Sequence, residues 1–213
     1  MDTIKSKYHE TLAATIIKNL EKRQMEGYYC PTVEDAEKLA FSFLKDGQNV
    51  SFGGSMTLEE TGMLTALRHD PSIHLIDRST AKTPEETKKM FHDALSSDVY
   101  FMSTNAITTN GELVNIDGTG NRVAALIYGP ETVIILAGMN KVAANVDEAL
   151  SRVHNIATAQ NCIRLGKKTP CAITGVCADC LSPDCICNQV VITRRSGIKG
   201  RIKVLLIGES FGY

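Results

Sequence analysis

Residues 49–62 read Asn-Val-Ser-Phe-Gly-Gly-Ser-Met-Thr-Leu-Glu-Glu-Thr-Gly, and this stretch decides the fold. The apolar run at 48–52 predicts a buried strand, and the Gly-Gly-Ser of 53–55 predicts the turn that follows it. Thr57 and Glu60 stand three residues apart, which is the spacing of a capping box at a helix start. A strand that leads directly into a helix is the building unit of a parallel α/β sheet.

The same alternation continues on both sides of this stretch. Strands are predicted at 73–77, 99–102, 132–137, 190–193 and 203–207, and helices at 3–25, from 32, from 83, at 122–127 and at 145–156. Asn110-Gly111 lies between two apolar pairs and predicts a hairpin with a type I′ turn, in which both central residues need a positive φ. The pattern favours one α/β domain over residues 1–213, with a mostly parallel sheet and helices on both faces.

Both ends of the chain add to this pattern. Residues 1–46 are predicted to form an N-terminal helical part, whose first helix ends at Gly27. Residues 170–188 are predicted to form a cysteine-rich loop, and the strands at 190–193 and 203–207 that follow it are expected to pair with each other.

The composition argues against several classes of protein. The chain has 213 residues, a formal net charge of −1 and no Trp, so the sequence offers no basic or base-stacking surface for nucleic acid. It has no run of about 18 apolar residues that would predict a membrane span, and its N-terminus lacks the apolar segment of a signal peptide. We therefore expect a cytoplasmic location, where thiols stay reduced and clustered cysteines more often bind metal than form disulfides.

Polar loops follow several of the predicted strands. Besides 53–55 they are 103–106 (Ser-Thr-Asn-Ala), 117–121 (Asp-Gly-Thr-Gly-Asn) and 138–141 (Gly-Met-Asn-Lys). The carboxyl ends of parallel strands meet at one edge of a sheet, where α/β proteins usually bind ligands. Glycines let a ligand approach the backbone, and a helix N-terminus favours an anion. The alternative for each loop is a tight turn that binds nothing.

Two charged residues in these loops are candidates for chemistry. Lys141 is the candidate for a fixed positive charge beside an anionic ligand, and the alternative is a solvated lysine near a helix start. Asp117 is the candidate general base, although an Asp that precedes Gly is more often a turn residue. The histidines are dispersed, and the sequence has neither a Walker loop nor a Ser-His-Asp signature.

Five of the seven cysteines lie close together, in the order Cys171-x5-Cys177-x2-Cys180-x4-Cys185-x-Cys187. The two-residue gap between Cys177 and Cys180 lets both sulfurs hold one metal centre. We expect Cys171, Cys177, Cys180 and Cys187 to bind zinc or an iron–sulfur cluster, because Cys185 is too close to Cys187 for both to point at one centre. The alternative is a thiol-rich loop without metal, with free or disulfide-linked cysteines.

Segments 49–62, 103–122 and 138–141, taken in this order, resemble the LUD domain of the lactate-utilisation family. Residues 170–188 resemble the cysteine-bearing tail of one single-domain subgroup. The resemblance implies the NagB/RpiA/CoA-transferase-like fold, shared by sugar-phosphate isomerases and CoA-transferases. Some LUD proteins belong to a bacterial system that oxidises L-lactate to pyruvate with iron–sulfur partners. By similarity, the pocket would be lined by Gly53, Gly54, Ser55, Thr104, Asn105, Gly118, Asn121 and Lys141.

The chain departs from the sugar-phosphate isomerases of this fold at two places. It reads Thr104-Asn105-Ala106 where they carry acidic residues, and Asp117 where they place a lysine. An amide cannot act as a general base, so ordinary isomerase chemistry is not expected. The nucleophilic glutamate of the CoA-transferases also has no clear counterpart.

Three functions remain open on the sequence alone. The first is a LUD-type component of organic-acid oxidation that binds a small anionic metabolite and an iron–sulfur cluster. The second is a stand-alone enzyme for a phosphosugar, a CoA ester or a hydroxy acid, with a structural zinc. The third is a non-catalytic module that senses metal or redox state. A homodimer is left open in each case.

Overall fold

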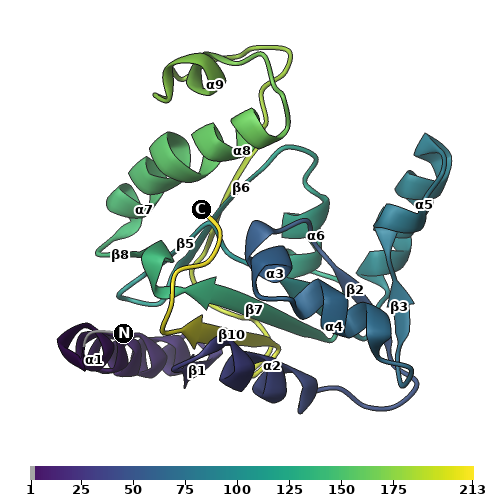
Figure 1. Cartoon of the computed structure of the whole chain (residues 1–213), viewed down its shortest axis with the longest axis vertical. Helices are drawn as coiled ribbons and strands as arrows, with labels where there is room; N and C mark the ends of the chain where they lie inside the picture. Colours follow the sequence, from purple (N-terminus) through teal and green to yellow (C-terminus); the bar gives the residue numbers. More distant parts are fainter. Residues whose placement is uncertain (1–2) are drawn as a thin grey trace.

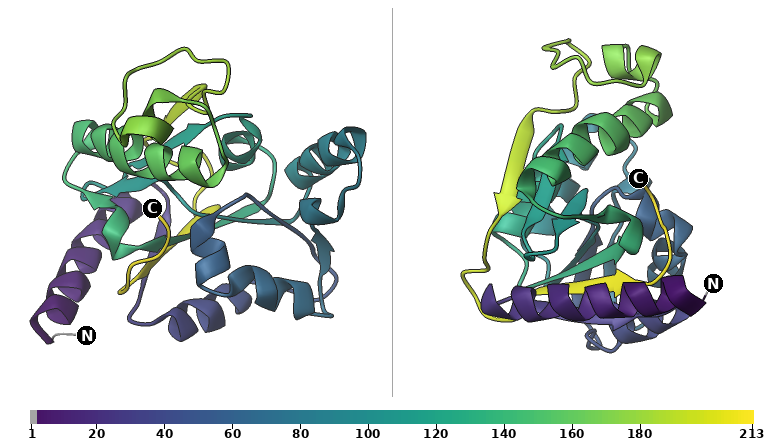
Figure 2. Two further views of the ribbon diagram at one scale, coloured as in Figure 1. Left: turned by 45° about the horizontal axis from the view of Figure 1, so that its top comes forward. Right: turned by 90° about the vertical axis from the view of Figure 1, so that its left-hand side faces the viewer.

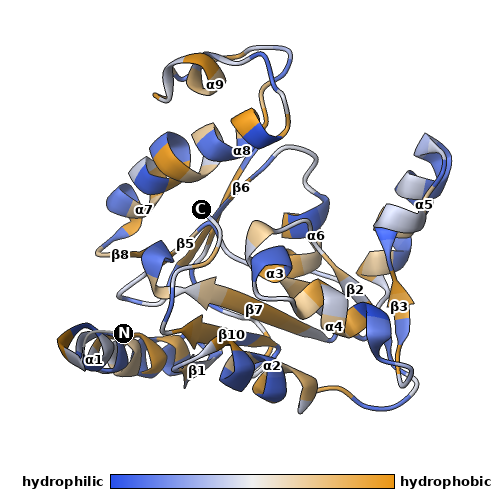
Figure 3. Ribbon diagram, viewed as in Figure 1, coloured by the Kyte–Doolittle hydropathy of each residue, from blue (hydrophilic) through white to orange (hydrophobic). Residues whose placement is uncertain are grey.

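The computed structural model describes residues 3–213 and has a six-stranded parallel sheet at its centre (Figure 1), with the strand order β1-β10-β7-β4-β2-β3. These strands are β1 (Glu26–Cys30), β2 (Asn49–Phe52), β3 (His74–Ile76), β4 (Val99–Met102), β7 (Thr132–Gly138) and β10 (Ile202–Ile207). The predicted α/β class with a mostly parallel sheet is confirmed. The apolar strands β7 and β10 stand out in Figure 3, as expected for strands covered on both faces.

Successive side chains of each central strand enter different cores on the two faces of the sheet. In β7, Val133 and Ile135 belong to one core, whereas Ile134 and Leu136 belong to the other. The first core includes side chains from α1 (Thr3–Lys22), α5 (Pro84–Leu95) and α6 (Asn121–Ile127). The second includes side chains from α2 (Val33–Phe41), α3 (Met56–Glu60) and α4 (Met63–His69). Each fully buried Leu or Ile in these cores contributes about 1.5–3 kcal/mol to folding.

A second sheet of four strands was not foreseen. Its order is β8-β5-β6-β9, with strands β5 (Ala106–Thr108), β6 (Leu113–Asp117), β8 (Val142–Ala143) and β9 (Gln189–Thr193). One long helical segment packs on it, composed of α7 (Val146–Arg152), a π-helical stretch (Val153–Thr158) and α8 (Ala159–Arg164). The short helix α9 (Pro170–Thr174) and the cysteine-rich loop extend beyond this segment, away from the six-stranded sheet (Figure 1).

The expected pairing of the last two strands is wrong. β9 pairs with β6 in the small sheet, whereas β10 lies between β1 and β7 in the large one. Figure 2 shows the chain running down β9 from the cysteine-rich loop and then crossing to the large sheet. The burial of the two strands differs accordingly, since β9 is half exposed and five of the six β10 residues are buried. An apolar pattern alone does not say which sheet a strand joins.

The N-terminal part contains a strand that the sequence analysis missed. Helix α1 ends at Lys22, and Gly27 is not a helix terminator but a residue of β1. A Cβ on Gly27 would lie 2.8 Å from Leu20 Cδ1 and 2.9 Å from Ile17 Cγ1, so glycine lets α1 pack directly on this strand. The chain reverses through Gln24, which has a positive φ of 59°.

The hairpin at Asn110-Gly111 is present, but its turn is not type I′. Strands β5 and β6 are antiparallel, and Gly111 has a φ of 86°, whereas Asn110 has no positive φ. The backbone amide of Thr108 donates to Glu112 O at 2.9 Å, which leaves a three-residue loop. Loops of this length place glycine at the third position, which explains why the dipeptide was informative while the turn type was wrong.

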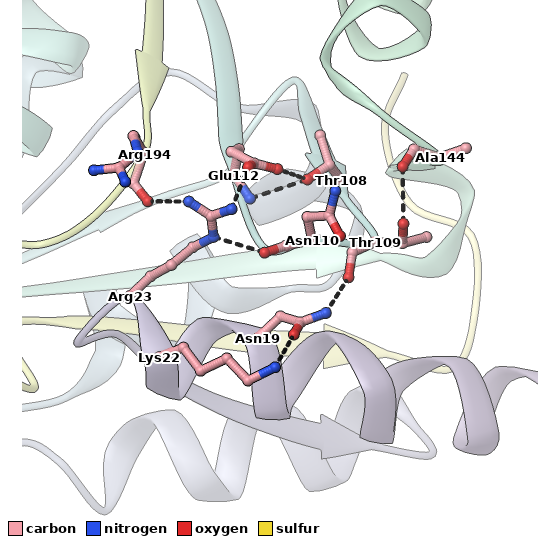
Figure 4. A network of polar contacts seen from close by, with 9 residues as sticks. All are labelled: Asn19, Lys22, Arg23, Thr108, Thr109, Asn110, Glu112, Ala144 and Arg194. Carbon is pink, nitrogen blue, oxygen red and sulfur yellow. Dashed lines mark hydrogen bonds and ion pairs between the residues drawn. The ribbon is translucent and has the colours of Figure 1, made fainter.

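A polar network fixes this hairpin to the end of α1 (Figure 4). Arg23 donates to Asn110 O and Arg194 O, both at 2.6 Å, and forms an ion pair with Glu112. Asn19 donates to Thr109 O at 2.9 Å. The small sheet is thereby joined to the helix that covers the large one.

Helix starts were mostly predicted correctly. Thr32, Thr83 and Asn145 each cap a helix by accepting a hydrogen bond from the third helical amide.

Within residues 3–213, none of the helices has the length and apolar character needed to cross a membrane.

Candidate functional site

A cavity of about 510 Å³ lies where the carboxyl ends of β2, β4 and β7 meet the small sheet. We refer to it as the strand-end cavity. Of the residues expected at the site, Gly54, Ser55, Thr104, Asn105, Gly118, Asn121 and Lys141 line it, and so does Asp117. Gly53 lies just outside the lining. The separate polar loops therefore converge on one hollow, and their role in ligand binding remains a prediction.

Lys141 lies in the short helical turn Met139–Lys141 after β7, and its side chain is only 3% exposed. Its Nζ lies 2.8 Å from Thr57 Oγ1 and 3.0 Å from Ser103 Oγ, to which it donates. Burial, together with the nearby guanidinium groups of Arg152 and Arg122, lowers the pKa of Lys141 to about 7, against an opposing effect of the Glu60 carboxylate. The solvated lysine that the sequence left open is thus not what the structure has.

Asp117 is committed to local structure. Its carboxylate accepts a hydrogen bond from the Gly120 amide at 3.0 Å and lies 3.2 Å from Arg122 Nε. Its side chain is 9% exposed. The structure therefore explains this carboxylate by the turn and the ion pair that it forms, and the assignment as a general base remains an untested prediction.

Arg122 holds together the inner wall of the cavity, which is the wall formed by the strand ends of the two sheets. The sequence analysis did not identify this arginine as a site residue. Its guanidinium donates to Ser103 O, Asn115 Oδ1, Asn105 Oδ1 and Ile116 O at 2.6 to 3.1 Å and pairs with Asp117. A guanidinium has five N–H groups, so this set of partners uses all of them. Arg122 consequently fixes the loop after β4 against the end of β6 rather than offering a donor to a ligand.

The glycines of the loop after β2 make room for arginine side chains. A Cβ on Gly53 would lie 3.0 Å from both Arg122 Cγ and the Tyr100 hydroxyl oxygen. A Cβ on Gly54 would lie 2.1 Å from Arg78 Nη2. Packing against Arg122 thus accounts for glycine at position 53, and the approach of a ligand to the backbone of this loop remains a prediction.

The cap of α3 is Ser55 and not Thr57. Ser55 Oγ accepts from the Leu58 amide at 3.3 Å. Thr57 instead donates to Phe211 O at 3.3 Å and accepts from Lys141, while Glu60 accepts from the Gly212 amide. The predicted capping box of Thr57 and Glu60 is therefore wrong. These two side chains instead bind residues 211–212 and the buried Lys141.

The charge of the cavity is the main feature that sequence reasoning missed. Its lining includes the cationic residues Arg78, Arg122, Lys141, Arg164 and Lys167, and Asp117 is its single acidic residue. Asp117 pairs with Arg122, and Lys167 lies 3.9 Å from Asp184. The guanidinium carbon of Arg78 lies over the ring of Phe91, 5.7 Å from the ring centroid. α3 has only five residues, so the positive potential comes from these side chains more than from a helix dipole.

The cysteine-rich loop forms part of the wall on the side away from the large sheet. Cys185 and Ile186 line the cavity, and Asn188 Nδ2 donates to Gly118 O at 2.9 Å. A Cβ on Gly118 would lie 3.4 Å from Ile186 Cα, so this glycine permits close contact between the two loops.

The four predicted metal ligands do not converge on one point. Cys171 packs in a small buried cluster with Cys162, and Cys177 Sγ lies 3.7 Å from His154 Nδ1. Cys187 Sγ lies 3.8 Å from Thr158 Oγ1, and burial raises its pKa to about 12. In the part of the chain that is described, no three His, Cys, Asp or Glu side chains are grouped so that they could hold a metal ion. As arranged, the thiols do not fit zinc or a cluster.

Comparison with solved structures shows a similar fold. A DUF162 family protein from Deinococcus radiodurans aligns with 93% of this chain and 98% of its own, with a TM-score of 0.53 and 11% identity. Partial likenesses include the eIF2B-beta2-delta2 complex from C. thermophilum (TM-score 0.37, 20% identity, 54% of this chain and 43% of that one). Another is ribose 5-phosphate isomerase A from Neisseria gonorrhoeae (TM-score 0.34, 13% identity, 52% of each chain).

The curated proteins contain no match to the chain. The family model of the LUD domain, however, matches residues 13–207, which include both sheets and every lining residue of the cavity except Tyr213. The resemblance stated on three short segments is thereby confirmed, and this chain belongs to the LUD domain family.

Proposed function

We propose that the strand-end cavity binds a small anionic metabolite, and that this binding serves lactate or other organic-acid utilisation in a bacterial cytoplasm. The observation that carries the proposal is the charge of the lining, where Arg78, Arg164 and Lys167 are cationic and Asp117 is the one carboxylate among the described residues. That carboxylate is already paired with Arg122, so it does not neutralise these three cations.

The volume supports a small ligand. Cavities of about 300–1,000 Å³ hold drug-sized molecules, so a space of about 510 Å³ accommodates a three-carbon acid with water, or one phosphosugar. Only the reactive end of a CoA ester would fit within it. Hydroxyl and amide side chains such as Ser55 and Asn121 lie among the cations and supply hydrogen-bond partners for carboxylate or phosphate oxygens.

A ligand panel tests this proposal. Thermal unfolding is measured at constant ionic strength with L-lactate, pyruvate, phosphosugars and CoA esters. We expect at least one anion to raise the melting temperature of the wild type and to lose this effect in Arg78→Met. The matched control is Lys45→Met, a cation outside the lining, which should respond like the wild type. A panel in which no anion stabilises the wild type contradicts the proposal.

The same panel separates the stand-alone enzyme from the component of lactate oxidation. Selective stabilisation by a phosphosugar or a CoA ester, with no response to lactate or pyruvate, favours a stand-alone enzyme. The structure supplies an argument against isomerase chemistry in particular, because the only acidic residue of the lining is engaged by Arg122 and Gly120.

We also propose that the cysteine-rich loop rearranges to bind zinc or an iron–sulfur cluster, with Cys171, Cys177, Cys180 and Cys187 as ligands. The observation that favours it is the density of free thiols, four of them only partly buried, on a segment without regular structure after α9. Because Cys185 borders the cavity, a rearranged loop would change the shape of the ligand site.

Metal analysis and an absorption spectrum of anaerobically purified protein test the loop. A visible absorption band and bound iron support electron transfer to iron–sulfur partners, and one equivalent of zinc without colour supports a structural site. If neither metal is bound, the proposed metal site is wrong, and the third hypothesis, a non-catalytic module that senses metal or redox state, is left to be tested by partner binding of Cys180→Ser. Sedimentation of the same sample decides whether the protein is a homodimer.

A further inference from the structure

Lys141 has an unusual set of partners for a buried lysine. Its Nζ has no carboxylate within hydrogen-bond distance, and its two partners in the described chain are the hydroxyls of Thr57 and Ser103. Both hydroxyl hydrogens are used elsewhere, because Thr57 donates to Phe211 O and Ser103 donates to Thr104 O, each at 3.3 Å. Each hydroxyl therefore offers Nζ an acceptor and not a donor.

This arrangement matches a neutral amine better than an ammonium ion. A neutral amine has two hydrogens and one lone pair, and the two hydrogens are taken by Thr57 and Ser103. The lone pair is then left without a donor, and it belongs to a side chain that lines the cavity while only 3% exposed. An ammonium ion would instead bury a positive charge near the guanidinium groups of Arg152 and Arg122, with the Glu60 carboxylate as a more distant anion outside hydrogen-bond distance, which is costly. A buried amine in its neutral form is the state in which lysine acts as a nucleophile.

The surroundings favour a substrate that carries a negative charge. Arg78, Arg164 and Lys167 line the same cavity, and Arg78 has no carboxylate partner within residues 3–213. Asn140, next to Lys141 in sequence, holds the tail across the strand ends through Gly212 O at 3.1 Å and the Phe211 amide at 3.2 Å. Asn140 thereby fixes the tail to the turn that carries Lys141, and the tail in turn accepts from Thr57, one of the two partners of the amine.

We propose that Lys141 forms a covalent imine with the carbonyl carbon of a small 2-keto acid whose carboxylate is held by the cavity cations. This rests on the proposed binding of a small anion at the same site. The lone pair of Nζ attacks the carbonyl carbon, and the carbonyl oxygen takes up a proton as the amine loses one, giving a carbinolamine. Loss of that hydroxyl group together with the second amine hydrogen releases one water and leaves a carbon–nitrogen double bond.

Reductive trapping tests the proposal with pyruvate as the probe. The wild type is incubated with pyruvate and sodium cyanoborohydride, which converts an imine into a stable secondary amine. We expect an intact mass increase equal to the mass of pyruvic acid less one oxygen atom, located on Lys141 by peptide mapping. The adduct should form at least fivefold faster on Lys141 than on any other lysine.

Two variants and one second ligand complete the experiment. Lys141→Met should lose the adduct, whereas Lys45→Met, which removes a lysine outside the lining, should keep it. L-lactate has no carbonyl group, so it should raise the melting temperature as an anion without giving an adduct. Peptide mapping on the wild type decides the site even if Lys141→Met fails to fold.

Different failures have different meanings. If lactate and pyruvate both stabilise the protein but no adduct forms on Lys141, the imine is wrong and anion binding stands. If neither acid stabilises it and no adduct forms, the imine is wrong, and anion binding is wrong as well only when the phosphosugars and CoA esters of the panel also fail to stabilise the protein. An adduct spread evenly over surface lysines also overturns the imine at Lys141.

Discussion

The two walls of the strand-end cavity are built differently. The inner wall comes from strand ends of the two sheets, and its polar groups are paired, as in the guanidinium of Arg122 and the amine of Lys141. The outer wall is the cysteine-rich loop, in which Cys177, Cys180 and Cys185 are partly exposed and the backbone from 176 to 188 forms no helix or strand.

The inner wall is therefore preformed before a ligand binds, whereas the outer wall can still change its conformation. A buried polar group that has all its partners is rigid, since breaking one contact leaves a charge or a donor unpaired. A loop with exposed thiols and few backbone hydrogen bonds opens at low cost in free energy. We therefore expect substitutions in the inner wall to change stability, and substitutions in the outer wall to change metal or ligand response instead.

The largest effect is expected for Arg122→Met. The substitution leaves the carboxylate of Asp117, 9% exposed, without its cation and removes the donors to the loop after β4. Removing one partner of a buried pair costs about 3–5 kcal/mol in the free energy of unfolding. Urea unfolding measures this value.

Arg164→Met is the matched control for Arg122→Met. Arg164 also lines the cavity, but it is exposed, and it donates to Asn161 within its own helix at 2.8 and 3.2 Å and lies close to the Tyr213 hydroxyl. A loss below about 0.5 kcal/mol is expected for such a surface position. Equal losses for the two arginines would show that the inner wall is not the rigid part.

The second-largest effect is expected for the pH dependence of the free energy of unfolding, to which Lys141 contributes. Its pKa is lowered from 10.5 to about 7 in the folded protein, so between these values unfolding takes up a proton. The free energy of unfolding therefore rises with pH across this window, by about 1.4 kcal/mol per pH unit. Lys141→Met should lack this rise. Urea unfolding of both proteins at pH 7, 8 and 9 gives the difference, and parallel curves would contradict a neutral amine.

A smaller effect is expected at the helix caps. Ser55→Ala and Thr32→Ala each remove a cap hydrogen bond and should each cost about 1 kcal/mol. Ser55 lines the cavity and Thr32 does not, so only Ser55→Ala should also weaken the thermal response to an anion. A ligand response that is the same in both variants would remove Ser55 from the site.

The smallest effect on stability is expected in the outer wall. Cys180→Ser should change the free energy of unfolding by less than about 0.5 kcal/mol, because the side chain is only partly buried and touches no core. Cys162→Ser places a hydroxyl in a buried cluster beside Cys171 and should cost about 1–3 kcal/mol. The effect on metal content should be the reverse, because Cys180→Ser removes a proposed ligand and Cys162→Ser does not. A metal site that survives Cys180→Ser would exclude Cys180 as a ligand.

The sequence predicted the inner wall in outline because local signals placed each of its loops directly after an apolar strand. Parallel pairing then brought Ser55, Asn105 and Lys141 together without any further information. Local patterns were also sufficient for the caps at Thr32 and Thr83. They placed the cap of α3 two residues late, because Ser55 and Thr57 both have the chemistry of a cap and only the tertiary partners of Thr57 decide between them.

The rest of the site depends on contacts far apart in the sequence. Arg122 binds groups from two separate segments, 103–105 and 115–117, and nothing in its local sequence indicates that this arginine will be buried. The partners of β9 and β10 are likewise set by the sheets that are already present. The prediction that four thiols share one centre was based on their spacing alone. Spacing fixes neither the path of a loop nor the direction of a side chain.

The position of β10 has a consequence for how the protein is made. It is the last strand along the described chain, yet it separates β1 from β7, and Lys203 pairs with Glu26 across 177 residues. Until β10 has left the ribosome, β1 has no neighbouring strand, and the large sheet consists of β7, β4, β2 and β3 alone. Ribosome-bound chains that stop before residue 202 should therefore be digested readily by protease at β1, and a contact that spans so much of the chain makes folding slow.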